Sequence, residues 1–283
     1  MKKYPALDVR CDSPDVLLAL VDDFSPTAAE ERDDSIRVFF ANAADRDAAR
    51  FTVASRYPVA PIDVADEDWA RRSQENLLPI TIGRVTIVPA PDAVLPNPDS
   101  VLIPTPHSLT PAPCTVVIVP SMGFGTGHHA TTRMCVEMLQ TLELNDRIVF
   151  DIGTGSGVLA IVAARLGAAK AIGIDNDPDA IQAARENLEE NRDIRNVSFE
   201  VADLMPFLNA HCGEADVVTA NLTGTLLERT AVDLEQAVRP GGWIVASGIL
   251  AEERNAVAAA FRSSVVVRES ADDEWVGLLM KKP

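Results

Sequence analysis

The 283-residue sequence has no uninterrupted run of about eighteen apolar residues, the length that a membrane-spanning helix needs. Its first residues, MKKYPALDVRC, carry two lysines with no apolar segment behind them, so we expect no secretory signal. Cysteine is also scarce: Cys11, Cys114, Cys135 and Cys212 have neither metal-ligand nor redox spacing. These absences predict a cytoplasmic protein with reduced thiols, no metal site and no membrane partner.

Basic residues are in short supply as well. The chain has 25 Lys and Arg against 42 Asp and Glu, which gives a net charge of −17. Acidic charge is densest in the first 68 residues, which hold eight basic and fifteen acidic side chains. Because nucleic-acid binding needs clustered Lys and Arg, the charge weighs against DNA or free RNA as a direct partner. It suits a basic protein partner, although solubility alone accounts for it equally well.

The length is that of two domains. Residues 1–65 are predicted to form a small α+β domain, and their β-α-β-α-β order is compatible with a ferredoxin-like sandwich. The expected strands are YPALDVRC, SIRVFFAN and YPVAPIDVAD, and the expected helices are SPDVLLALVDDF, with Ser13 as N-cap and Pro14 in its first turn, and ADRDAARFTVAS. Residues 66–115 are predicted to be a connector, because their prolines forbid a long helix or a central strand. Within it, ITIGRVTIVPAP predicts paired strands.

Residues 116–283 alternate apolar strands with amphipathic helices. The expected strands are TVVIVP, RIVFDI, KAIGID, VSFEVA, ADVVTAN and GGWIVAS, and the expected helices are HATTRMCVEMLQTLEL, GVLAIVAARLG, PDAIQAARENLEENR, TGTLLERTAVDLEQAV and AEERNAVAAAFRS. Continuous apolar strands between helices indicate a parallel sheet covered on both faces. The last segments, SVVVRES and EWVGLLMKK, predict a hairpin that adds one antiparallel strand, and Trp275 within it is expected to pack in the core.

The stretch DIGTGSG, Asp151 to Gly157, predicts a tight glycine turn at the end of a strand. Open α/β sheets bind ligands at such turns, because the backbone there can approach the ligand closely. The spacing is not the dinucleotide fingerprint, since Val158 stands where its third glycine should be, and no Gly-Lys-Ser/Thr of a P-loop follows.

The acidic residues around this turn indicate which ligand it takes. The carboxylate of Asp151 would repel a pyrophosphate and welcome a cationic amine, and Asp175, at the end of the next strand, can accept both hydroxyls of a ribose. S-adenosylmethionine has an amino-acid tail, a ribose and no phosphate. The arrangement resembles that of class I methyltransferases, and Asp203 resembles the acid that reaches the adenine amine, with a solvated loop acid as the alternative. We therefore expect a site for S-adenosylmethionine that includes Asp151, Gly153, Gly155 and Asp175.

A second glycine-rich stretch, GFGTGHHATT, runs from Gly123 to Thr132. Thr131 and Thr132 are suitable capping residues for the helix that follows, but capping does not explain the glycines. The stretch MGFGTGHHATTRMCVEML resembles the FGTGxHxTT segment of the PrmA family, whose members methylate ribosomal large-subunit protein eleven. The resemblance continues through DIGTGSGVLAIVAARLGAAKAIGIDNDPDAI, ADVVTANLTGTLLE and RPGGWIVASGIL, and covers residues 116–250.

The resemblance implies a small N-terminal substrate-recognition domain, a linker and a class I methyltransferase domain, in a protein that we expect to be a monomer. It implies that Thr132, Gly153, Asp175 and Asn221 contact the cofactor, and that Phe124, Gly125 and Thr126 cover it. The family usually has Thr and Pro where this chain has His128 and Ala130, which is expected to alter the stiffness of the loop. The first 60 residues contain no motif that matches the family.

Methyl transfer to an amine needs the amine to be neutral and its lone pair aimed at the methyl group. Asn221 is the candidate catalytic residue, because its side-chain oxygen can accept the protons of the amine; capping of the next helix or cofactor contact is the alternative. His128 and His129 are candidates for a base, with bracing of the loop as the alternative for His129. Three hypotheses follow: an amine methyltransferase acting on the ribosomal protein, a methyltransferase of another protein or small molecule, and a non-catalytic S-adenosylmethionine-binding protein.

Overall fold

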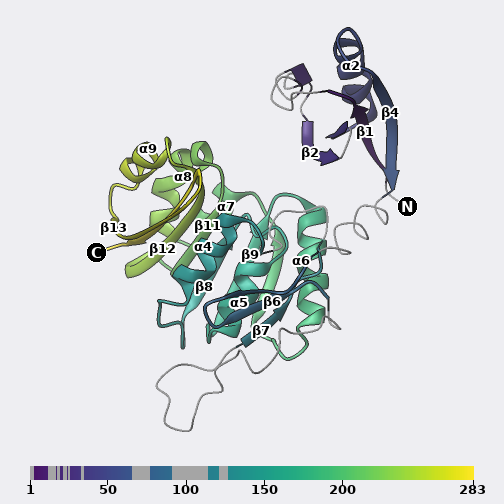
Figure 1. Cartoon of the computed structure of the whole chain (residues 1–283). Helices are drawn as coiled ribbons and strands as arrows, with labels where there is room; N and C mark the ends of the chain where they lie inside the picture. The colour runs from purple at the N-terminus through teal and green to yellow at the C-terminus, as the bar shows by residue number, and fades with distance from the viewer. Residues whose placement is uncertain are drawn as a thin grey trace. The chain divides into compact units, whose positions relative to one another are not determined.

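The chain forms two compact units, Met1–Glu75 and Asn76–Pro283 (Figure 1). The computed structural model describes residues 3–11, 17, 20–21, 24, 26–32, 35–65, 77–90, 114–120 and 127–283. The expected helix start at Ser13 and Pro14, the proline-rich part of the connector, and Phe124, Gly125 and Thr126 lie outside these residues. The domain limits expected at residues 65 and 115 stay predictions.

The first unit contains a four-stranded antiparallel sheet in the order β2-β3-β1-β4. Its elements are β1 (Lys3–Val9), β2 (Pro26–Arg32), β3 (Ser35–Phe40), α2 (Ala43–Ala54) and β4 (Val59–Ala65). This order and the helical residues Leu17, Leu20 and Val21 between β1 and β2 are those of a ferredoxin-like β-α-β-β-α-β unit. Strand β4 lies at the edge, where its proline, Pro61, is tolerated. Strand β2 was missing from the expected elements.

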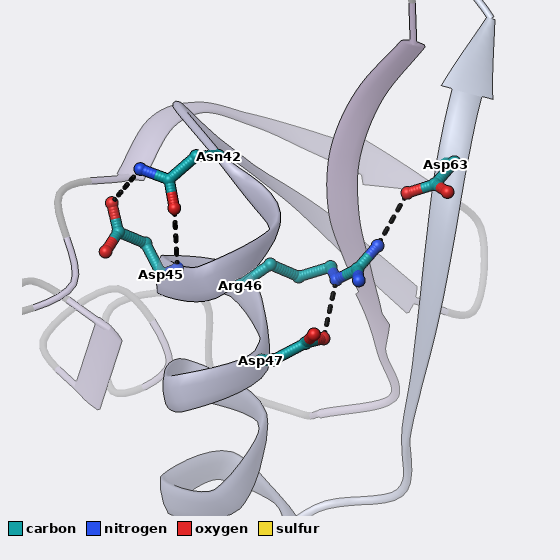
Figure 2. Close-up of polar contacts among 5 residues, drawn as sticks. All are labelled: Asn42, Asp45, Arg46, Asp47 and Asp63. Atoms are coloured by element: carbon teal, nitrogen blue, oxygen red, sulfur yellow. Dashed lines mark hydrogen bonds and ion pairs between the residues drawn. The ribbon is translucent and has the colours of Figure 1, made fainter.

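Helix α2 is tied to the sheet by polar contacts at its start (Figure 2). Its N-cap is Asn42, whose side-chain oxygen accepts a hydrogen bond from the backbone of Asp45 at 3.0 Å. Next along the helix, Arg46 pairs with Asp63 on β4 at 2.6 Å and with its neighbour Asp47 at 2.8 Å. The buried side chains Ala49 and Val53 then place the helix on one face of the sheet.

The second unit is built on a seven-stranded sheet in the order β10-β9-β8-β11-β12-β14-β13. Its strands are β8 (Ile148–Ile152), β9 (Lys170–Asp175), β10 (Val197–Val201), β11 (Ala215–Asn221), β12 (Val238–Leu250), β13 (Val265–Asp272) and β14 (Trp275–Lys281). Strand β14 pairs antiparallel with both β12 and β13, and the pairs among β8 to β12 are parallel. The expected parallel sheet with one inserted antiparallel strand is confirmed.

Helices cover both faces of this sheet (Figure 1). They are α4 (Ala130–Leu139), α5 (Val158–Arg165), α6 (Pro178–Glu190), α7 (Leu204–Ala210), α8 (Gly224–Ala237) and α9 (Arg254–Ala260). Successive strand residues face different cores: Val149 and Val217 pack with α4, α5 and α6, whereas Phe150 and Val218 pack with α7, α8 and α9. Burial on both faces explains why these strands are continuous apolar runs.

A separate three-stranded sheet contains β5 (Ile80–Ile82), β6 (Val85–Val88) and β7 (Cys114–Val117). The antiparallel β5–β6 pair confirms the expected paired strands, but β7 pairs parallel with β6 and lies outside the large sheet. Two buried amides at α6 hold it: the side-chain oxygen of Asn191 accepts from the backbone of Val117 at 3.0 Å, and that of Asn187 from Val119 at 2.8 Å. Among the described residues, no helix is both long and apolar enough to cross a membrane.

Candidate active site

Three of the predicted site residues lie at the carboxyl ends of adjacent strands of the large sheet. Asp175 ends β9, Asp151 is the penultimate residue of β8, and Asn221 ends β11. The strand order reverses between β8 and β11, and open α/β sheets bind ligands at such a reversal. The sheet therefore brings together side chains that are up to 70 positions apart in the sequence.

The glycine turn between β8 and α5 has a backbone that only glycine adopts readily. Gly153, Gly155 and Gly157 have φ values of 69°, 52° and 80°. A Cβ on Gly153 would lie 2.5 Å from the Leu222 side chain, and one on Gly157 would lie 2.6 Å from Phe199. The turn therefore has left-handed backbone and is closely packed. Because its glycines have no side chains, a ligand at the carboxyl ends of the strands can approach the backbone directly.

Asp151 is buried beneath this turn, with 1% of its surface exposed. One carboxylate oxygen accepts from the Thr154 hydroxyl and the other from the Thr219 hydroxyl, each at 2.6 Å. Burial raises the pKa of Asp151, and the two threonine hydroxyls oppose that rise. Both oxygens therefore brace the turn against β11, and the expected contact of Asp151 with the cofactor stays a prediction.

Asp175 has a different environment, because its side chain is half-buried and faces the loop. Its Oδ2 accepts from the backbone N–H of Gly155 at 3.1 Å, and its Oδ1 accepts from that of Asp177 at 3.0 Å. A carboxylate has about four acceptor positions, so two remain for a ligand. Asp203 is exposed just beyond β10, next to the end of β9, at the position expected of the third acid.

Asn221 reaches across to the first turn of α4. Its Nδ2 lies 3.2 Å from the hydroxyl oxygen of Thr131 and 3.5 Å from that of Thr132, both of which are buried. The Thr131 hydroxyl lies 2.8 Å from Nδ1 of His129, and this nitrogen also accepts from the Thr131 backbone N–H. Because Nδ1 is an acceptor, the Thr131 hydroxyl donates to it and accepts from Asn221. The amide orientation of Asn221 is thereby fixed.

The end of the first glycine stretch is anchored separately. Gly127 has a φ of 87°, and a Cβ there would lie 2.5 Å from the side chain of Ile87 on β6. Nε2 of His128 lies 2.9 Å from the carbonyl oxygen of Leu78. His129 is the N-cap of α4, so the expectation that Thr131 or Thr132 caps this helix was wrong. A threonine two or three positions later is already inside the helix.

Comparison with known proteins identifies the family. The family described as "Ribosomal protein L11 methyltransferase (PrmA)" matches residues 28–283. The chain is 36% identical over 281 residues to a protein of Deinococcus radiodurans named ribosomal protein L11 methyltransferase, covering 93% of each chain. A protein of the same name from Pseudomonas aeruginosa is 38% identical and covers 76% of this chain and 67% of its own.

The chain belongs to the PrmA family. It is therefore an S-adenosylmethionine-dependent methyltransferase with the class I fold. A solved structure described as ribosomal protein L11 methylase from Lactobacillus delbrueckii subsp. bulgaricus has the same fold, with a TM-score of 0.61, 23% identity, and coverage of 73% of this chain and 98% of that chain.

The site residues fit the methyl donor of the PrmA family. The glycine turn allows a ligand to approach the backbone closely, and Asp175 keeps acceptor positions for a ribose. The sequence after the turn lacks the Lys with which a P-loop binds phosphate. Sequence reasoning missed the threonines that organise the site, Thr131, Thr154 and Thr219. All three lie close in sequence to a predicted site residue, but Thr131 bonds to Asn221 and Thr219 to Asp151 over separations of 90 and 68 positions, so these two contacts had no local signal.

Proposed function

We propose that this chain transfers methyl groups from S-adenosylmethionine to amines of ribosomal protein L11, on lysine side chains, the N-terminal amine or both. The names of its relatives support the substrate. The observation that carries the amine chemistry is the fixed side chain of Asn221, which lies at the same sheet edge as the glycine turn.

The residues that hold the cofactor come from before and after Asp151 in the sequence. Gly153 and Gly155 present backbone to the amino-acid tail, and Asp175 accepts hydrogen bonds from the ribose hydroxyls. Thr132 contacts the cofactor from the first turn of α4, and Phe124 and Thr126 contribute to its cover. When bound, S-adenosylmethionine would supply a methyl group on a sulfonium: the nitrogen of a neutral amine would bond to the methyl carbon as its bond to sulfur breaks, releasing S-adenosylhomocysteine and one proton.

Asn221 aims the incoming amine. A lysine has to lose a proton first, which costs roughly 4–5 kcal/mol near pH 7. Since Nδ2 of Asn221 donates to Thr131, its Oδ1 is left to accept from the amine, and none of the described residues donates to it. An acceptor fixed in this way orients the lone pair and stabilises the charge that develops on nitrogen.

The proposal extends to the surroundings of the reaction. The net charge of −17 favours encounter with a basic ribosomal protein over free nucleic acid. All four cysteines are free thiols, which fits the reducing cytoplasm. The proposed oligomeric state is a monomer.

The test is intact-protein mass spectrometry of ribosomal protein L11 from the same organism, incubated with this protein and S-adenosylmethionine. Stepwise gains of methyl mass are expected. A second basic ribosomal protein is the matched control and is expected to gain none. Binding of S-adenosylhomocysteine, measured by calorimetry, shows that the protein is intact. Binding without methylation of L11 would contradict the proposed substrate, and equal methylation of both proteins would contradict its selectivity.

A further inference from the structure

The turn between β13 and β14 packs against the start of α4. A guanidinium nitrogen of Arg133 pairs with the carboxylate of Asp272 at the end of β13. At the start of β14, the Trp275 ring meets the His129 ring edge-on, with centroids 5.1 Å apart and planes at 69°. The C-terminal hairpin therefore contacts the helix start through an ion pair and a ring contact.

The helix and the hairpin are also close-packed below this turn. A Cβ on Gly277 of β14 would lie 3.2 Å from Cβ of Met134 and 3.1 Å from Cε of Met138. Glycine at this position lets α4 approach the strand closely. Trp275, expected to be a core residue, is instead half-buried and directed at His129.

The same residues lead inward to the site. The other terminal nitrogen of Arg133 donates to the backbone carbonyl of His128, which immediately precedes the N-cap. His129 accepts from the Thr131 hydroxyl, and that hydroxyl accepts from the amide of Asn221. Two routes, one through Arg133 and one through the rings, thus connect the hairpin turn with the residues that orient Asn221.

We propose that Arg133, Asp272 and Trp275 are positioning residues, which hold the first turn of α4 so that Thr131 fixes the side-chain amide of Asn221. The consequence for catalysis rests on the proposed function of Asn221. The effect on the orientation of the Asn221 amide is independent of that function, because it can be measured in the protein without any substrate.

A control for this proposal lies on the same strand. Arg254 of α9 pairs with Glu269 of β13, and the two side chains are 30% and 41% exposed, against 34% and 43% for Arg133 and Asp272. Exposed ion pairs of this kind add little to stability. Equal effects of breaking either pair would indicate a merely structural role, whereas a displaced catalytic group can lower a rate about a hundredfold.

The experiment compares Asp272→Ala with Glu269→Ala. The first readout is the side-chain amide signal of Asn221 in a nitrogen–proton correlation spectrum, assigned by its loss in Asn221→Asp. We expect Asp272→Ala to shift or broaden this signal and Glu269→Ala to leave it in place. The second readout is methylation of L11: kcat is expected to fall about tenfold in Asp272→Ala, with KM for S-adenosylmethionine within about twofold, and to stay unchanged in Glu269→Ala.

Ring variants test the second route. Trp275→Phe keeps an aromatic ring for His129 and is expected to retain more of the wild-type signal and rate than Trp275→Leu. An unmoved Asn221 signal in both Asp272→Ala and Trp275→Leu would overturn the proposal, as would an equal change in Glu269→Ala. If the wild-type protein fails to methylate L11, the spectra alone decide the positioning role, so that failure of the proposed substrate is recognised separately.

Discussion

The side-chain amide nitrogen of Asn221 lies 3.2 Å from the hydroxyl oxygen of Thr131, although the two residues are 90 positions apart. This contact joins the carboxyl end of β11 to the first turn of α4. The Thr131 hydroxyl donates its proton to Nδ1 of His129, so its oxygen accepts from Nδ2 of Asn221. The amide oxygen of Asn221 therefore points away from Thr131. An acceptor oriented in this way fits the role proposed for Asn221, which is to aim a neutral amine at the methyl group of the donor.

Removal of the Thr131 hydroxyl is the direct test of this relationship. Thr131→Val keeps the shape of the side chain but takes away the acceptor, so the amide of Asn221 is free to turn. We expect kcat for L11 to fall about tenfold, with binding of S-adenosylhomocysteine within about threefold. Steady-state kinetics and calorimetry measure the two quantities.

Thr230→Val is the control for Thr131→Val. Thr230 is also a buried helix threonine, and its hydroxyl donates to the carbonyl of Leu226 in its own helix at 2.7 Å. Both variants are expected to lose about 1 kcal/mol of unfolding free energy, but only Thr131→Val should lose activity. Equal kcat values in the two variants would mean that Thr131 has no role beyond packing.

Substitution of Gly157 tests the glycine turn. In Gly157→Ala, the methyl group meets Phe199 at 2.6 Å and Ala184 at 3.0 Å, on a backbone with a φ of 80°. Backbone strain and overpacking together are expected to cost about 2–4 kcal/mol of unfolding free energy. Gly213→Ala separates the two causes, since Gly213 has a φ of 71° and nothing within 4 Å of the added carbon.

The Gly213→Ala variant is expected to lose only the strain component, about 1 kcal/mol. Urea denaturation gives both free energies, and binding of S-adenosylhomocysteine is expected to weaken in Gly157→Ala alone. A loss in Gly213→Ala as large as that in Gly157→Ala would show that strain, and not the close packing of the turn, dominates.

Hydrophobic periodicity predicted most of the second unit, because its strands are buried on both faces and its helices on one. It failed where burial is slight or the element is short. Strand β2, with the sequence PTAAEER, is an edge strand with exposed alanines and charged residues, so it has no apolar alternation. Helix α7 contains Pro206 and has only seven residues, which are too few to show a helical repeat of apolar positions.

The site was predicted in part for a different reason. Glycines and acids at strand ends are local signals, and Gly153, Gly155 and Asp175 could be found from them. The partners of Asn221 and Asp151 could not, because Thr131 and Thr219 reach them only when strands and a helix that are distant in sequence come together. Likewise, TVVIVP has the composition of a central strand, and only its pairing with β6 assigns it to the small sheet.

Asp151 is expected to make the stability of the protein depend on pH. Burial raises the pKa of this carboxyl in the native state above its value in the unfolded chain. At a pH below the pKa of Asp151 in the unfolded chain, the carboxyl is protonated in both states, and its contribution to the free energy of unfolding is fully present. As the pH rises from there through the raised native pKa, the unfolded state loses its proton first, so the free energy of unfolding falls.

The Asp151→Asn variant cannot ionise and so lacks this contribution. The measurement is urea denaturation of both proteins at a series of pH values from about 4 to about 8, which spans the window above the ordinary aspartate pKa. We expect the difference in unfolding free energy, wild type minus variant, to decrease as the pH rises through that window. A difference that stays constant or increases with pH would contradict the buried, raised pKa of Asp151.

Asp175 provides the sharpest test of the cofactor site. Its carboxylate oxygens already accept from Gly155 and Asp177, and the proposed ribose contacts would use the positions that remain. Asp175→Asn turns one acceptor into a donor that faces a backbone N–H and removes the charge from the ribose contacts. Because hydrogen bonds to charged groups contribute about 1.5–3 kcal/mol, we expect the Kd for S-adenosylhomocysteine to rise about ten- to a hundredfold by calorimetry.

Asp177→Asn is the matched control, two residues further along the same loop. Asp177 is the N-cap of α6, where its Oδ1 accepts from the backbone of Asp179 at 2.9 Å. Asparagine caps a helix as well as aspartate does, so this variant loses a nearby charge with no change in structure. A Kd within about twofold of wild type for Asp177→Asn, beside a large rise for Asp175→Asn, would assign the effect to the ribose contact, because general loss of negative charge would weaken both variants alike.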